Sequence, residues 1–248
     1  MRKIELMAVA LTTVTTGWLQ ATALLTWEFS GINSAADTPT LTKDTLVSTG
    51  GFRRGAGAIT SGLTRPEAWG GTGFSGATKA DSILSDTCLM FDIIVGADVL
   101  LSLDSIEAPW FGYQVSGGPG GTGGTLYGQW QYSLSNGLGW SDIGGETGLL
   151  PFGYYDWLSL DLKSYTDLQG ITDATVTFRL LLWGGDKQGN TEFYFGKDTV
   201  DPLPGLSDTY PNSLTINGTV ITLFVPEPSA AFLAIIGAAS LLLRRRHL

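Results

Sequence analysis

The sequence predicts an all-β protein: a two-sheet, jelly-roll-like sandwich, flanked by an N-terminal signal peptide and a C-terminal hydrophobic helix. Short segments alternate apolar and polar residues, as strands with one buried face do. Turn-forming residues separate these segments, and the chain contains 34 glycines. Aromatic residues favour strands, and the chain has 8 tryptophans, 8 tyrosines and 11 phenylalanines. A stretch of roughly 200 residues between the two ends fits a single sandwich domain.

The N-terminal half of this domain contains the less regular strands. Residues 25–30 alternate as a half-buried strand does. Between residues 31 and 82 we expect short strands or loops, because glycine, serine and threonine cluster there. The pattern then strengthens, and three separate strands are predicted at residues 88–95, 99–106 and 110–115. Val99, Leu101 and Leu103 should face the same side of their strand.

The C-terminal half contains the clearest hairpin. Asn136-Gly137 is a turn pair that joins the alternating residues 129–135 to the return strand at 139–143. The glycine-rich residues 117–124 are expected to form a variable loop, because ordering glycines costs conformational entropy. A single helical turn is expected at residues 165–170. The remaining strands are predicted at residues 157–162, 175–183, 191–195 and 213–224.

The C-terminus carries a different pattern. The triplet Pro226-Glu227-Pro228 precedes an apolar run of 14 residues, 230–243, and the cluster Arg244-Arg245-Arg246 follows the run. As a helix the run would be roughly 21 Å long, which is short for a hydrocarbon core of about 30 Å. The prolines stop the helix from extending backwards, and the arginines favour the cytoplasmic side. Residues 225–248 are therefore predicted to hold the chain transiently in the inner membrane, with the preceding domain outside.

This C-terminal arrangement resembles the bacterial PEP-CTERM sorting signal, which a membrane protease-transpeptidase called exosortase processes. Pro226, Glu227 and Pro228 match its recognition motif position by position. The resemblance implies an exosortase-type partner, cleavage near the prolines, and association with exopolysaccharide or the biofilm matrix. The preceding domain is similar to the ectodomains of such proteins in residues 54–57, 101–103, 132–137, 160–162, 177–180 and 214–218. It departs from them at residues 117–124 and between 195 and 213, where an individual function would lie.

The N-terminus indicates export as well. Arg2 and Lys3 precede an apolar stretch at residues 6–11, and Ala21-Thr22-Ala23 forms a small-residue cleavage pattern with Ala21 and Ala23 at its ends. Residues 1–23 are therefore predicted to be a signal peptide, and residues 24–224 to be the ectodomain. The predicted location is the inner membrane at first, and then the cell surface or the extracellular space.

The charge of the exported segment excludes some classes of partner. The two ends hold 5 of the 14 basic and 2 of the 23 acidic residues, so residues 24–225 carry 9 basic and 21 acidic side chains, a net charge of −12. Nucleic acids and anionic lipid surfaces require cationic faces. We therefore expect neither as a partner.

Two single residues exclude several kinds of active site. Cys88 is the only cysteine, so no intrachain disulfide can form, and its apolar surroundings predict a buried structural thiol. His247, the only histidine, lies in the C-terminal tail. The exported domain therefore lacks the histidine that a Ser-His-Asp triad, a Cys-His dyad or a histidine zinc site requires.

Carboxylates provide the remaining candidates for chemistry. Glycosidases use two acids, and three pairs could be brought together by the fold: Asp156 with Asp161, Asp104 with Glu107, and Glu192 with Asp186. A chain with so many carboxylates supplies such pairs by chance, so we interpret them as solvated surface charge. No cofactor is expected; calcium, held by Asp186, Asn190, Asp198 and Asp201, would act as a structural stabiliser.

Aromatic residues gather in the middle third of the chain, namely Trp110, Tyr113, Tyr127, Trp130, Tyr132, Trp140, Tyr154, Tyr155 and Trp157. We expect most of them in the core, with Trp130 and Tyr132 on one face of their strand. Exposed rings would instead stack on sugars. The leading hypothesis is a non-enzymatic exported structural or interaction protein; the alternatives are a lectin-like carbohydrate-binding module and, less favoured, a glycosidase.

Overall fold

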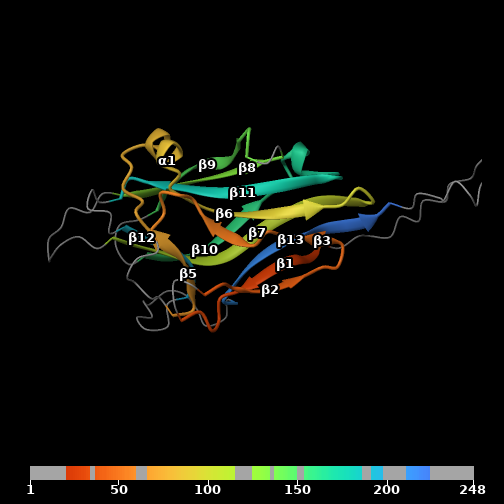
Figure 1. Cartoon of the computed structure of the whole chain (residues 1–248), viewed down its shortest axis with the longest axis horizontal. Helices are drawn as coiled ribbons and strands as arrows, with labels where there is room; N and C mark the ends of the chain where they lie inside the picture. Colours follow the sequence, from red (N-terminus) through yellow and green to blue (C-terminus); the bar gives the residue numbers. More distant parts are fainter. Residues whose placement is uncertain are drawn as a thin grey trace, which may run out of the picture.

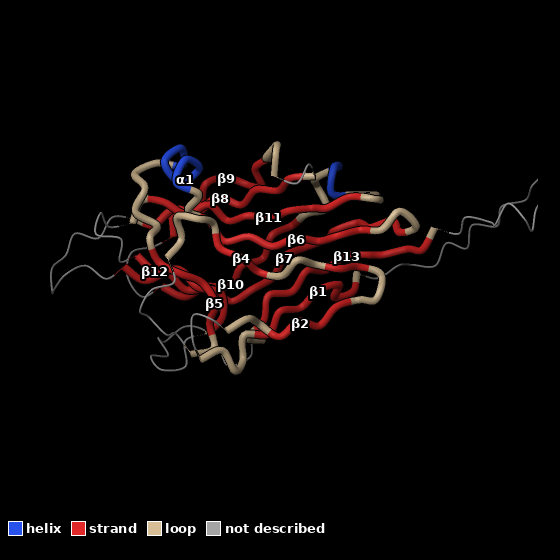
Figure 2. Tube along the Cα trace, viewed as in Figure 1, coloured by secondary structure: helices blue, strands red, loops and turns tan. Residues whose placement is uncertain are grey.

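The computed structural model describes residues 21–33, 37–59, 66–114, 125–134, 137–149, 154–185, 191–197 and 211–223. These residues form two antiparallel sheets that face each other, with one short helix outside one of them (Figure 1). The strands of both sheets run along the long axis of the molecule (Figure 2). The predicted all-β, two-sheet architecture is confirmed.

Both predicted targeting segments lie largely outside the described residues. This holds for residues 1–20 of the expected signal peptide and for the whole of residues 225–248. Across the part of the chain that is described, no helix is long and apolar enough to cross a membrane. Export and sorting therefore remain predictions from the sequence.

The first sheet, sheet A, contains seven strands. They are β1 (Thr22–Glu28), β2 (Thr40–Lys43), β5 (Ala68–Thr72), β7 (Val99–Gln114), β10 (Tyr154–Asp161), β12 (Thr191–Gly196) and β13 (Ser213–Thr222). Their order is β2-β1-β13-β7-β12-β5, and β10 pairs with β7. Because β7 pairs with β10 at the same residues at which it pairs with β13 or β12, β10 lies on the opposite side of β7 and forms an edge of the sheet.

The second sheet, sheet B, contains six strands. They are β3 (Val47–Ser48), β4 (Phe52–Arg54), β6 (Cys88–Val95), β8 (Leu126–Ser133), β9 (Ser141–Leu149) and β11 (Ala174–Trp183). Their order is β3-β6-β11-β8-β9, and β4 pairs with β6. The predicted pairing of residues 129–135 with residues 139–143 is confirmed, since β8 and β9 pair antiparallel. The predicted turn at Asn136-Gly137 stays a prediction, because Asn136 lies outside the described residues, and the strands end at Ser133 and begin at Ser141 rather than next to it. In this sheet β9 forms an edge.

The sequence prediction of two strands at residues 99–106 and 110–115 was wrong. The structure has one continuous strand, β7, of 16 residues. Ile106, Ala108 and Trp110 keep alternating toward the core through the expected break. Pro109 is tolerated because it lies where the pairing with β13 ends and the pairing with β12 begins. The expected common face of Val99, Leu101 and Leu103 is confirmed, since all three are buried.

The short helix α1 (Lys79–Ser85) was not predicted. Thr78 and Asp81 form a capping box at its N-terminus, in which Asp81 N–H donates to Thr78 Oγ1 at 3.2 Å and Thr78 N–H donates to Asp81 Oδ2 at 2.9 Å. The helix lies on the outer side of sheet B (Figure 2). It has only seven residues, too few to show a helical hydrophobic period. The predicted turn at residues 165–170 is confirmed as the 3₁₀ helix η1 (Thr166–Leu168).

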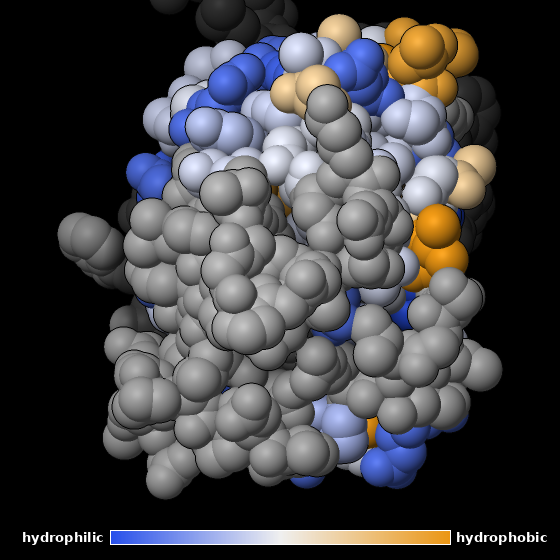
Figure 3. Space-filling view, turned by 90° about the vertical axis from the view of Figure 1, so that its left-hand side faces the viewer, coloured by the Kyte–Doolittle hydropathy of each residue, from blue (hydrophilic) through white to orange (hydrophobic). Residues whose placement is uncertain are grey.

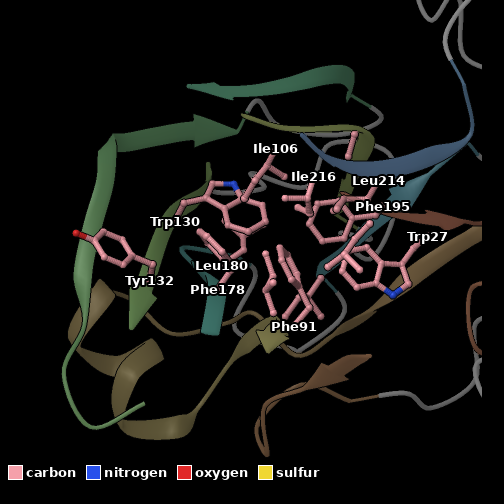
Figure 4. Close-up of a cluster of buried hydrophobic side chains, with 14 of the residues drawn as sticks. Trp27, Phe91, Ile106, Trp130, Tyr132, Phe178, Leu180, Phe195, Leu214 and Ile216 are labelled. Carbon is pink, nitrogen blue, oxygen red and sulfur yellow. The ribbon is translucent and has the colours of Figure 1, made fainter. Parts of the chain in front are cut away.

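The core between the sheets is rich in aromatic rings, and Figure 4 shows Phe91, Phe178, Phe195 and Trp130 converging on one another. Phe91 stacks on Phe178 with ring centroids 5.3 Å apart. Trp130 and Tyr132 both belong to this core, so the expected common face of the two residues is the inward one. The aromatic residues thus hold the two sheets together.

Candidate functional site

The candidate site is a groove between the two sheets where their edge strands β9 and β10 face each other. It encloses about 270 Å³ and is lined by residues of β7, β8, β9, β10, β11 and β12. The sandwich is thus incompletely filled along this edge. Cavities that are largely apolar with a few polar groups are the usual form of small-molecule sites.

Aromatic rings form the floor of the groove. Trp110 of β7 stacks on Phe193 of β12 with centroids 5.5 Å apart and an interplanar angle of 18°. Phe193 meets Phe195 edge-on at 5.4 Å, and Phe195 lies 5.9 Å from Trp130 of β8. These four residues come from three strands that lie far apart in the sequence.

Glycines keep the groove open. Gly128 of β8 and Gly144 and Gly145 of β9 line it, at a point where the pairing of β8 with β9 shifts register. Gly144 has φ +65°, which favours glycine, and its N–H donates to the Tyr165 hydroxyl at 2.6 Å. A Cβ added at Gly145 would have no neighbour within 4 Å. A side chain at position 145 would therefore meet no steric obstacle beside the groove.

The groove has one charged group at its mouth. Asp156 of β10 is the single charged side chain among the described residues that line it. It lies opposite Trp110 in the strand register, and its Oδ1 accepts the N–H of Trp157 at 2.7 Å. Ser159 lies on the same strand and also lines the groove. The site therefore combines stacking surfaces with hydrogen-bonding groups at its rim.

A second depression, the polar hollow, lies on the outer face of sheet A. It encloses about 540 Å³, and its polar lining consists of Asp104, Ser105, Glu107, Ser159, Asp161, Lys163 and Asn217. Asn217 Nδ2 donates to Ser105 Oγ at 3.0 Å, which donates to Glu107 Oε1 at 3.1 Å. Lys163 Nζ is 3.8 Å from Asp104 Oδ2. This depression is polar where the groove is aromatic.

The structure brings one of the three candidate carboxylate pairs into the same depression, separates a second pair and leaves the third untested. Asp104 and Glu107 line the same polar hollow. Asp156 and Asp161 lie on opposite faces of β10, because five positions separate them and side chains alternate along a strand. Glu192 is buried in β12, and Asp186 lies outside the described residues. The fold therefore does not bring Asp156 and Asp161 together.

The ring of Trp140 contacts Arg179 on the outer face of sheet B. The guanidinium of Arg179 lies 3.8 Å from the centre of the Trp140 ring, and Arg179 Nε donates to Gln131 Oε1 at 2.8 Å. Gln131 Nε2 in turn donates to Asp142 Oδ1 at 2.6 Å. Burial lowers the pKa of Arg179. One face of Trp140 is therefore already covered, which makes this ring a poor sugar-stacking candidate.

The predicted burial of Cys88 is confirmed. Its side chain is inaccessible, and burial together with the adjacent Asp86 raises the pKa of the thiol to about 12. Thiolates are the reactive form of cysteine. Cys88 is therefore a structural residue, as the sequence indicated.

Several predicted site residues lie outside the described residues: the calcium candidates Asp186, Asn190, Asp198 and Asp201, the motif Pro226-Glu227-Pro228, and the cluster Arg244-Arg245-Arg246. Within the described ranges, no three His, Cys, Asp or Glu side chains are grouped so that they could hold a metal ion. Ala21 precedes β1, and Ala23 lies within it, paired with Asn217. Their role as a cleavage pattern stays a prediction.

The groove itself was not predicted from the sequence. Trp110 and Trp130 were named as aromatic candidates, but Phe193, Phe195 and the three glycines were not. A usable signal was the glycine pair at positions 144 and 145, since glycine inside a strand marks a bulge or an open space. On the face that Figure 3 shows, the described surface is mostly hydrophilic or intermediate, with hydrophobic residues in separate small spots. Such scattered exposure is ordinary.

No family model and no curated protein matches the chain. Among solved structures, a carbohydrate-binding module specific for non-crystalline cellulose, CBM28, aligns over 66% of this chain and 88% of its own, with 10% identity and a TM-score of 0.36. The CBM22-1 xylan-binding domain of Xyn10C from Paenibacillus barcinonensis aligns over 82% of this chain and 97% of its own, with 9% identity and a TM-score of 0.30. Similarity at this level carries no argument about function.

Proposed function

We propose that this chain is an exported, non-catalytic protein that binds a neutral polysaccharide in the groove between β9 and β10. The observation that carries the proposal is the aromatic floor made by Trp110, Trp130, Phe193 and Phe195. Sugar rings present apolar C–H faces to aromatic rings and hydroxyl groups to the rim. The floor and the carboxylate of Asp156 at the rim match these two requirements.

The charge of the site favours an uncharged ligand. Asp156 is negative, the described lining of the groove contains no cation, and the exported segment carries a net charge of −12. Uronic-acid polymers would be repelled by both the local and the overall field. Neutral glycans carry no such penalty, and a carboxylate is a good acceptor for their hydroxyl groups.

Within the groove, the described carboxylates favour binding over hydrolysis. Glycosidases place two carboxyl groups about 5–5.5 Å or about 6.5–9.5 Å apart across the scissile bond. Asp156 is the one carboxylate among the described residues that line the groove. A single carboxylate beside an aromatic floor supplies affinity and orientation without the second group that the reaction needs.

Export and sorting complete the proposal. The triplet Pro226-Glu227-Pro228 with its apolar run and arginine cluster would direct the chain to an exosortase-type enzyme after transient anchoring in the inner membrane. Consecutive strands from β9 to β12 alternate between the sheets, which supports the jelly-roll-like assignment of the ectodomain. At the cell surface, a polysaccharide-binding ectodomain would attach to the exopolysaccharide matrix. The proposal thus combines two hypotheses from the sequence, the exported structural or interaction protein and the lectin-like carbohydrate-binding module.

Blocking the groove tests this function. Gly145→Phe places a ring where a Cβ has no neighbour within 4 Å, so the fold should tolerate it. Binding of the full chain in detergent to soluble neutral polysaccharides (hydroxyethylcellulose, xylan, galactomannan) should weaken at least about tenfold by affinity electrophoresis. Polygalacturonate should not bind either protein.

Glu146→Phe is the matched control, because Glu146 is exposed and does not line the groove. It adds the same ring at the next position and should leave binding unchanged. Equal binding by Gly145→Phe and the unaltered chain would place the ligand elsewhere. Failure of the unaltered chain to retain any neutral polysaccharide would reject the proposed function.

A further inference from the structure

The aromatic groove adjoins the polar hollow on the outer face of sheet A. Ser159 lines both depressions. It lies on β10, which forms the edge of the sheet and pairs with β7. An extended ligand that fills the groove can therefore continue over this one edge strand and reach the hollow.

The outer side of β10 presents binding groups along this route. Trp157, Ser159 and Asp161 occupy alternate positions and share the face on which Glu107 of β7 lies. Alternate residues on a strand are about 6.6 Å apart, so the three side chains span roughly 13 Å. Trp157 is half-buried, so part of its ring faces solvent. The strip offers one stacking surface followed by a hydroxyl and a carboxylate.

The polar hollow supplies both donors and acceptors. The Asn217 amide, the Ser105 hydroxyl and the Glu107 carboxylate form a hydrogen-bonded series with distances of 3.0 and 3.1 Å. Lys163 lies 3.8 Å from Asp104, so a cation stands among the carboxylates. Each sugar hydroxyl can both donate and accept a hydrogen bond. This mixed lining matches hydroxyl groups better than a lining of carboxylates alone would.

Resting on the proposed function, we infer that one neutral polysaccharide chain occupies both depressions at once. It fills the aromatic groove, crosses β10 beside Trp157 and Ser159, and hydrogen-bonds to Asn217 and Glu107 in the hollow. The protein then recognises an internal stretch of a polymer rather than a single sugar. Affinity must therefore rise with the length of the glycan until both depressions are filled.

A length series of glycans tests this inference. Affinities of the full chain in detergent are measured by calorimetry for cello-, xylo- and manno-oligosaccharides, from the disaccharide to the hexasaccharide. In the series that binds, Asn217→Ala should weaken the hexasaccharide by roughly three- to tenfold, the loss expected for one hydrogen bond. The disaccharide, which fits in the groove alone, should bind both proteins equally.

Two further variants fix the interpretation. Thr219→Ala changes a neighbouring partly exposed residue of β13 that lines neither depression, and it should leave every affinity unchanged. If Asn217→Ala lowers the melting temperature, Glu107→Gln replaces it as the test, because glutamine keeps the shape of the side chain. Glu107→Gln should then show the same length-dependent loss of affinity. Equal affinity for all lengths, or an equal loss for the disaccharide, would overturn the inference and leave the proposed function standing. Absence of binding to any oligosaccharide or neutral polymer would overturn both.

Discussion

Two aromatic regions of the same sandwich are packed differently, and the difference lies in the residues that face them. Phe91 is 1% exposed, and the ring centroids of Trp27, Phe52 and Phe178 lie 5.1–5.4 Å from its own ring centroid. Trp110 is 7% exposed and stacks on Phe193 at the floor of the groove. Rings surround Phe91, whereas three of the six sheet B residues that line the groove with Trp110 are glycines, at positions 128, 144 and 145. Aromatic composition alone therefore does not distinguish a core from a binding site.

The largest effect is expected in the closed region. Phe91→Ala removes a ring that is enclosed by other rings, and its neighbours cannot fill the space. Such substitutions cost about 3–5 kcal/mol, because the cavity adds to the lost transfer free energy. Urea unfolding followed by tryptophan fluorescence measures the change. A loss below about 1 kcal/mol would mean that this region is as loosely filled as the groove.

A smaller effect is expected in the open region. Phe193→Ala widens a groove that already holds space, so little new cavity is enclosed and mainly the transfer term is lost. That term is about 1.5–3 kcal/mol for a fully buried side chain. The same unfolding experiment should rank Phe193→Ala clearly below Phe91→Ala. Equal losses would show that the floor of the groove is packed like the core.

The same contrast separates what the sequence could predict from what it could not. The strands at Cys88–Val95 and Ala174–Trp183 were predicted closely, because a short run rich in apolar residues is a local property of the chain. The single strand β7 was not, since Pro109 suggests a break unless the strands beside it are known. Helix α1 was missed because its capping box spans only Thr78 to Asp81.

The groove depends on pairings that the sequence does not encode locally. Trp110 meets Phe193 only because β7 pairs with β12, and Asp156 lies opposite Trp110 only because β10 pairs with β7. The expectation that most of the clustered aromatic residues lie in the core holds for Trp110 and Trp130, which are both buried. It could not show that the edge strand facing them carries Gly144 and Gly145 and leaves the space above them unfilled.

The smallest effect concerns the edge strand β9, where a carboxylate outside the groove can be compared with Asp156 at its mouth. Asp142 accepts hydrogen bonds from Lys79 of α1 at 2.8 Å and from Gln131 at 2.6 Å. Partial burial disfavours its charge, but these hydrogen bonds and the Lys79 charge outweigh burial and lower the pKa of Asp142. Asp142 therefore stabilises the fold, whereas Asp156 is proposed to bind the ligand.

The pH dependence of stability follows from this lowered pKa. The unfolded state binds the proton more tightly, so the stabilisation from Asp142 is complete above the ordinary aspartate pKa of about 4 and is lost as pH falls through the lower folded-state pKa. Asp142→Asn should therefore cost less than about 1 kcal/mol at pH 7, as exposed ion pairs do, and nothing at the acid end.

Urea midpoints of the unaltered chain and of Asp142→Asn, measured between pH 7 and pH 2, should therefore become equal as the pH falls. Lys79→Met should show the same convergence with pH, and the double variant should lose no more than either single variant, because the two side chains act as a pair. Asp156→Asn should destabilise the fold at pH 7 no more than Asp142→Asn does, while it weakens glycan binding. A larger loss of stability in Asp156→Asn than in Asp142→Asn would reverse the assignment of the two carboxylates, since Asp156 would then support the fold rather than a ligand.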